Sequence, residues 1–168
     1  MKKAGESMYK LLLIVVMMTV WVSIHLLQVE EELAMKTLFQ GKHAINRATH
    51  AAAQQVDLEA LGEGLLRLAP EEAAGAASLY LRENLRLDTL GVPLPSSFLK
   101  HQVKVVVFEV VNTEQAFPYT YRNTEYNYEV TLRKPGVIMI VHMVYPRAFQ
   151  VMEPIEWYLK GAAELVSG

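Results

Sequence analysis

Residues 41–57, GKHAINRATHAAAQQVD, form a stretch that is rich in small side chains and decides the expected fold of the chain. Small residues recur in it at steps of three and four, which is the periodicity of one helix face. Such a stripe leaves a groove in which another helix backbone can approach closely. The groove predicts a helix-packing interface, filled either by a helix of a partner or by the chain's own second helix. The residues of this predicted interface are Gly41, Ala44, Ala48 and Ala52.

An apolar run, LLLIVVMMTVWVSIHLL at residues 11–27, precedes this stretch and carries no formal charge when His25 is neutral. It corresponds to about 26 Å of helix, and flanking residues extend it toward the roughly 30 Å hydrocarbon core of a membrane. Lysines precede the run and glutamates follow it at residues 30–32, so the positive-inside rule places the N-terminus in the cytoplasm. A secretory signal peptide is the alternative interpretation. The predicted parts of this single-pass cell-membrane protein are a cytoplasmic start at residues 1–10, a transmembrane helix at 11–29 and one extracytoplasmic domain at 30–168.

The helix of the apolar run is expected to continue into the small-residue stretch. No proline interrupts residues 1–69, and apolar residues keep one helix face as far as Val56. Pro70 suits the first position of a second helix, predicted at residues 70–86, and the prolines and glycine of residues 88–98 predict a loop after it. The first half of the chain is therefore predicted to be mainly helical.

The composition changes from alanine to valine after residue 100. Runs of β-branched and aromatic residues predict three strands, and residues 134–136 predict a tight hairpin between the second and the third. From Pro154 onward, the spacing of apolar residues predicts a short C-terminal helix. Helices segregated from a run of strands indicate an α+β fold with an antiparallel sheet of about three strands. The predicted strands are residues 103–111, 126–133 and 137–145.

The composition and motifs disfavour several classes of function. A formal charge of -2, from 16 basic and 18 acidic residues without a basic block, offers no surface for nucleic acid. The sequence has no cysteine, no phosphate-binding glycine loop and no His-Glu-x-x-His pair. His43 and His50 lie two turns apart on one helix face, but no carboxylate with ligand spacing accompanies them. We therefore expect a non-catalytic protein without cofactor or metal.

Aromatic residues concentrate in the segment TEQAFPYTYRNTEYNY, which begins at Thr113. Exposed aromatic side chains in loops favour partner contacts, because they combine a large contact area with a polar tip. The alternative is that alternate tyrosines simply cover the sheet. The candidate partner loop consists of Phe117, Tyr119, Tyr121, Tyr126 and Tyr128.

Taken in order, a basic start and an apolar helix are followed by INRATHAAAQQVD (45–57), AAGAASLYLRENLRLD (73–88) and a valine-rich C-terminal sheet. This order, over most of residues 9–145, resembles the TadE-like and TadG-like pilin-related proteins of tight-adherence pilus systems. The resemblance implies a pseudopilin-like subunit whose N-terminal helix is held in the membrane and whose globular part lies outside. Prepilin processing in that family uses glutamate as the fifth residue after a glycine, whereas Lys10 stands fifth after Gly5 here. We therefore expect a permanent anchor.

These features together predict a single-pass envelope protein that acts as a subunit or assembly factor of a pilus-like or secretion-type machine. Its expected partners are the membrane and other envelope or pilus-machine proteins, with a homo-oligomer as one form of assembly and no nucleic acid. The alternative is a membrane-anchored extracytoplasmic sensor or ligand-binding module, in which the sheet and its tyrosine loop hold a small ligand. A pocket of adequate size between sheet and helices would favour that alternative.

Overall fold

The computed structural model describes residues 2–147 and 153–166, with side chains from residue 7 onward. The chain divides into two compact units, Met1–Lys36 and Thr37–Gly168, which are described separately. Helix α1 (Lys2–Ala52) contributes to both units. The predicted apolar helix and its continuation are therefore one helical element, which ends at Ala52 rather than at the predicted Val56.

In the first unit, α1 presents apolar side chains on all sides. The large apolar residues from Met8 to Val29 are 39–77% exposed. By length and composition this helix is long and apolar enough to cross a membrane. Its hydroxyl groups bond to the helix backbone, because Thr19 Oγ1 donates to the carbonyl of Val15 at 2.9 Å and Ser23 Oγ donates to that of Thr19 at 2.8 Å. These polar groups therefore bring no unsatisfied donor to the apolar surface.

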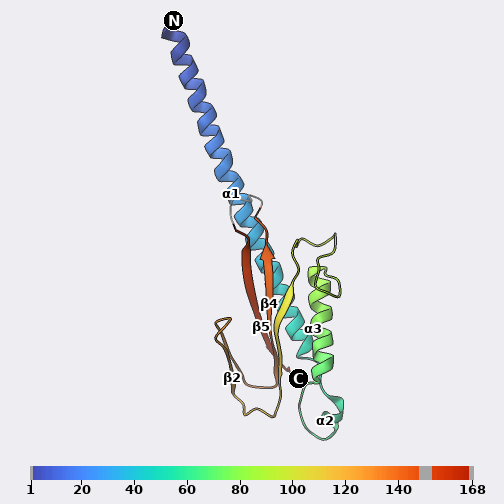
Figure 1. Ribbon diagram of the computed structural model, residues 1–168. Helices are drawn as coiled ribbons and strands as arrows, with labels where there is room; N and C mark the ends of the chain where they lie inside the picture. Colours follow the sequence, from blue (N-terminus) through green and yellow to red (C-terminus); the bar gives the residue numbers. More distant parts are fainter. Residues whose placement is uncertain (1, 148–152, 167–168) are drawn as a thin grey trace. The chain divides into compact units, whose positions relative to one another are not determined.

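Two further helices follow within the described part of the second unit (Figure 1). Helix α2 (Leu58–Gly62) is a short turn capped by the side chain of Asp57. Helix α3 (Pro70–Leu85) begins with proline at its first position and ends where Arg86 adopts a left-handed φ of 54°. The second helix predicted at residues 70–86 is confirmed.

The main sheet has three antiparallel strands in the order β1-β4-β5. Strand β1 (Lys104–Val111) pairs with β4 (Gly136–Tyr145), and β4 pairs over its whole length with β5 (Ile155–Glu164). The central strand, β4, is buried along its first six residues, as expected for a nearly continuous apolar run covered on both faces. The predicted α+β class is confirmed, together with a sheet of about three strands.

The predicted short C-terminal helix is wrong, because strand β5 occupies the residues from Ile155 to Glu164. Apolar residues in this segment recur at steps of three and four, which led to the helix prediction. They also recur at every second residue, and Trp157, Leu159 and Ala163 all contribute to the core. Ten paired positions with β4 satisfy the strand backbone and fix the two-residue period.

Strands β2 (Tyr119–Asn123) and β3 (Tyr128–Leu132) form a separate antiparallel hairpin. The hairpin predicted at residues 134–136 is therefore wrong, since β3 pairs with β2 and not with β4. Residues 134–136 instead lead from the two-stranded sheet into β4. Strand β2 lies inside the predicted aromatic loop, where its short alternation of threonine, tyrosine and arginine does not resemble an apolar strand.

Both faces of the main sheet are covered. Successive β4 residues point to opposite faces, so Val137, Met139 and Val141 join the core on the side of α1 and α3, whereas Ile138 joins a second core under the β2–β3 hairpin. On the helix side, α1 approaches β5 closely. A Cβ on Gly161 would lie 2.4 Å from Cγ2 of Ile45, a spacing that only a glycine allows.

Candidate functional site

The surface between α1 and α3 forms a cleft in the second unit. On α1, Gln40, His43, Arg47 and His50 follow each other at steps of three, four and three, so they share one face of the helix. That face is polar and exposed, whereas the alanine stripe is apolar and buried in the core. The 41–57 stretch therefore supplies both a packing surface and a polar wall.

The cleft consists of two adjoining hollows that share His43 and Arg47. One hollow has a volume of about 380 Å³ and the other about 590 Å³. The second hollow is closed on one side by the segment after α3. The residues that line only one of the two hollows are Asn46, His50, Ala51, Gln54 and Tyr80 in the smaller, and Gln40, Ala44, Asn84, Arg86, Ser96 and Phe98 in the larger.

Hydrogen bonds across the cleft hold its walls together. Arg47 Nη1 donates to Asn84 Oδ1 at 2.7 Å, and Asn84 Nδ2 donates to the carbonyl of Tyr80 at 2.7 Å. Arg86 Nη1 donates to the carbonyl of Ser96 at 3.3 Å, which attaches the segment after α3 to the same wall. Gln40 shares a hollow with Asn84, and His50, later in α1, shares one with Tyr80, earlier in α3, so the two helices run antiparallel along the cleft.

The lining of the cleft is rich in hydrogen-bond donors and has a positive charge. It combines two arginines and two histidines with the side-chain amides of Gln40, Asn46, Gln54 and Asn84. Among the described residues that line it there is no aspartate or glutamate, although the chain has more acidic than basic residues. Arginine forks and amide donors suit a carboxylate or a phosphate. The cleft is therefore lined by groups of the kind that bind anions.

His43 and His50 line the same hollow, as their spacing on one helix face predicts. Within the described residues, no group of three or more histidine, aspartate or glutamate side chains has a geometry that could hold a metal ion. Arg47, which lies between the two histidines on the helix, shares the hollow with them. The two histidines and Arg47 therefore lie together in one hollow of the cleft.

The structure places the predicted helix-packing residues in the interior of the second unit. Gly41, Ala44, Ala48 and Ala52 are all buried, and the three alanines share one core with Ala73 and Ala77 of α3. A Cβ on Gly41 would lie 2.7 Å from Cδ1 of Leu159 and 2.8 Å from Sδ of Met143, so the sheet also reaches this stripe. In this structure the stripe faces the chain's own sheet and helix.

Four residues of the candidate partner loop pack against the main sheet. Tyr121 belongs to the second core, and Phe117, Tyr119 and Tyr128 lie against it. Burial, with a smaller contribution from Tyr121, raises the pKa of Tyr128. Tyr126 lies farther out, where its ring centroid is 5.0 Å from that of Tyr158 on β5. The structure brings the five aromatics to one hairpin, which the sequence already groups.

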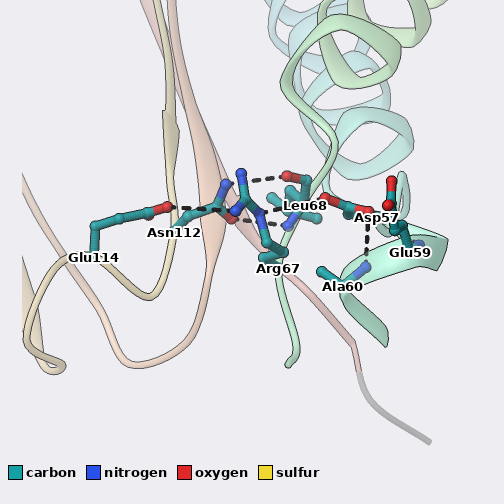
Figure 2. Close-up of polar contacts among 7 residues, drawn as sticks. All are labelled: Asp57, Glu59, Ala60, Arg67, Leu68, Asn112 and Glu114. Carbon is teal, nitrogen blue, oxygen red and sulfur yellow. Dashed lines mark hydrogen bonds and ion pairs between the residues drawn. The ribbon is translucent and has the colours of Figure 1, made fainter. Parts of the chain in front are cut away.

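A polar cluster that sequence reasoning missed joins the loop before α3 to the end of β1 (Figure 2). Buried Asn112 binds both backbone groups of Leu68, accepting from its N–H at 2.8 Å and donating to its carbonyl at 3.0 Å. Arg67 lies between two carboxylates, 3.4 Å from that of Asp57 and 3.8 Å from that of Glu114. The only sequence signal was an asparagine directly after an apolar run, which resembles an ordinary turn residue.

A search for similar proteins found no matching family model, no matching curated protein and no matching solved structure.

Proposed function

We propose that the chain is a non-catalytic, single-pass envelope protein that serves as a pseudopilin-like subunit or assembly factor of a pilus or secretion-type machine. The observation that carries this proposal is the change of character along α1. From Met8 to Val29 its large apolar side chains are exposed, whereas from Ala44 to Ala52 its small side chains are buried under a sheet. One helix thus supplies an apolar surface for lipid or neighbouring helices and the support of a folded domain.

The charge pattern around the apolar segment supports a cytoplasmic N-terminus and an extracytoplasmic second unit. Lys2, Lys3 and Lys10 precede the segment and residues 30–32 are glutamates. Single cysteines at Ser7 and at exposed Thr113 test this orientation in intact cells, because the native chain contains no cysteine. A membrane-impermeant maleimide is expected to label the cysteine at position 113 and not that at position 7. The reverse pattern would refute the orientation.

An assembly role requires that the apolar segment do more than anchor the protein. A photo-crosslinking amino acid at Trp21, which is exposed on α1, is expected to give discrete adducts with the same chain or with a small set of envelope proteins. A matched variant keeps the second unit and replaces residues 11–27 by an unrelated apolar helix carrying the same crosslinker. Loss of the adducts with retained membrane localisation supports assembly through α1. Unchanged adducts in the exchanged variant would reduce α1 to a simple anchor and contradict the proposed role.

The second candidate function is a membrane-anchored sensor or ligand-binding module, and the cationic cleft between α1 and α3 favours it. Its volume and its donors suit a small anionic ligand. Native mass spectrometry of the purified full chain tests this function. A bound small anion that is lost in the Arg47→Gln variant would favour the sensor, and ligand-free protein together with α1-dependent adducts would favour the assembly subunit.

A further inference from the structure

The segment between α3 and β1, residues 86–103 (the α3–β1 loop), presents apolar side chains to solvent. Leu90 is 73% exposed, and Val92, Leu94 and Phe98 are also exposed. These residues belong to a loop with a fixed conformation, because Leu87, Leu99 and Val103 of the same segment are buried in the core. The exposed apolar groups are thus held outward by buried neighbours.

Hydrogen bonds from backbone N–H groups fix the tip of the α3–β1 loop. Asp88 Oδ1 accepts from the N–H groups of Leu90 and Val92 at 2.8 Å each, and the Val103 N–H donates to the carbonyl of Gly91 at 2.9 Å. Gly91 has a φ of +78°, and a Cβ there would lie 2.4 Å from the carbonyl oxygen of Val103. The tip therefore needs glycine at this position, and Leu90 is presented by an ordered turn.

The charges around the apolar tip are almost all positive. Arg86, Lys100 and Lys104 are exposed, and the one acidic residue from position 86 to 104 is Asp88, which binds the loop's own backbone. An exposed leucine at the opposite end of α3, in α2, has acidic neighbours instead of basic ones. Leu58 is 78% exposed but is flanked by Asp57 and Glu59. The α3–β1 loop thus combines exposed apolar side chains with cations, which is the combination that binds anionic lipid surfaces.

The α3–β1 loop also lies beside the start of the α1 segment that belongs to the second unit. Ser96 and Phe98 line the same hollow as Gln40, and Figure 1 shows this loop at the end of α3 opposite α2. Gln40 follows Val29, the end of the predicted span, by 11 residues of the chain. The chain itself therefore tethers the second unit by a short segment to the predicted span.

We propose that the α3–β1 loop is a second membrane contact, in which Leu90 and its apolar neighbours enter the interface of an anionic bilayer while Arg86 and Lys100 bind lipid phosphates. This inference rests on the proposed membrane anchor, which brings the loop to the bilayer. The cleft residues Arg47 and Gln40 lie directly behind the contact and offer further donors to a headgroup. The second unit would then be held in one orientation on the membrane by two points of attachment.

Site-specific quenching in the full-length protein tests this contact. Single cysteines at Leu90, Leu58 and Val16 carry an environment-sensitive fluorophore, in nanodiscs that contain a shallow nitroxide-labelled lipid. The discs are made of phosphatidylcholine alone or of phosphatidylcholine with phosphatidylglycerol. We expect loss of fluorescence at positions 16 and 90 but not at 58, and a larger loss at 90 when phosphatidylglycerol is present. The double variant Arg86→Gln/Lys100→Gln is expected to abolish that dependence on phosphatidylglycerol.

If nitroxide lipid quenches the fluorophore at position 16 but neither the one at 90 nor the one at 58, the second contact is overturned and the anchor is left intact. A blue shift at position 90 without nitroxide quenching would assign the loop to a protein partner and would also overturn it. Absence of quenching at position 16 would refute the anchor itself, and quenching at position 90 in that case would still support direct lipid binding by the loop.

Discussion

Replacing Gly161 by alanine tests the close approach of α1 to β5. The new methyl carbon would lie 2.4 Å from Cγ2 of Ile45 and 3.2 Å from Cγ2 of Thr49, whereas carbon atoms in contact normally lie about 3.5–4.0 Å apart. Neither neighbour can turn aside easily. Ile45 is fully buried and β-branched on a helix, which leaves it one strongly preferred rotamer, and Thr49 Oγ1 is bonded to the carbonyl of Ile45 at 3.0 Å.

The helix and the strand must therefore separate locally, and overpacking of this kind costs about 1–3 kcal/mol. We expect Gly161→Ala to lower the free energy of unfolding by about 2 kcal/mol, which corresponds to a fall of roughly 4–8 °C in Tm. Urea unfolding of the full chain in detergent, followed by circular dichroism, measures the change.

Two other glycines provide controls with the same chemical change. Gly75 lies exposed within α3 with open space around its missing Cβ, so Gly75→Ala should stabilise the protein by about 1 kcal/mol through helix propensity. Gly41→Ala should fall between the two, because the same propensity gain opposes contacts with the movable ends of Leu159 and Met143. A Gly161→Ala protein as stable as the wild type would refute the packing of α1 on β5. A destabilised Gly75→Ala protein would refute the reasoning from space and propensity.

Ala48→Leu should lower the free energy of unfolding by about 1–3 kcal/mol, because Ala48 is fully buried in the core. Unchanged stability, together with a loss of crosslinks to other proteins, would instead assign the alanine stripe to a partner helix. Asn112→Ala should lower the free energy of unfolding in urea by about 1–3 kcal/mol, since it leaves the buried N–H and carbonyl of Leu68 without their partner. Unchanged stability would refute a stabilising role for these two hydrogen bonds. Desolvation, and to a smaller extent the charge of Lys160, lowers the pKa of Lys42 below its ordinary value of 10.5. Between that lowered pKa and 10.5 the unfolded chain binds more protons than the folded chain. The free energy of unfolding therefore rises with pH in this window. The difference in unfolding free energy between the wild type and Lys42→Met should therefore shift in favour of the wild type as the pH rises from neutrality toward 10.5, and a difference that is independent of pH would contradict the lowered pKa of Lys42.

The sequence predicts those elements whose local signals agree with their tertiary surroundings. Pro70 and the alanine–leucine stripe after it define α3, and the apolar run of β4 defines a strand covered on both faces. Residues 155–164 carry two periods at once, and only the pairing of β5 with β4 decides between them. Strand β2 is likewise specified by its partner β3, because its own residues are polar or aromatic at alternate positions.

The candidate site could be predicted only in part. Spacing alone places His43 and His50 on one face of α1, and it identifies the alanines as a packing surface. The occupants of these two faces depend on how distant segments dock. Asn84 and Arg86 reach the histidine face because α3 runs antiparallel to α1, and Leu159 reaches the glycine of the stripe because β5 closes the sheet. Neither arrangement leaves a local pattern that one sequence reveals.

The packing of β5 on α1 also imposes an order in time. Thr49 and Gly161 are 112 positions apart, so a ribosome completes α1 long before it makes the strand that covers it. Until β5 is made, Ile45 and Thr49 lack the close contact that Gly161 provides. Domains generally fold as units during and after synthesis. The newly made chain thus passes through an interval in which this part of α1 lacks its strand partner, and the synthesis of β5 ends that interval.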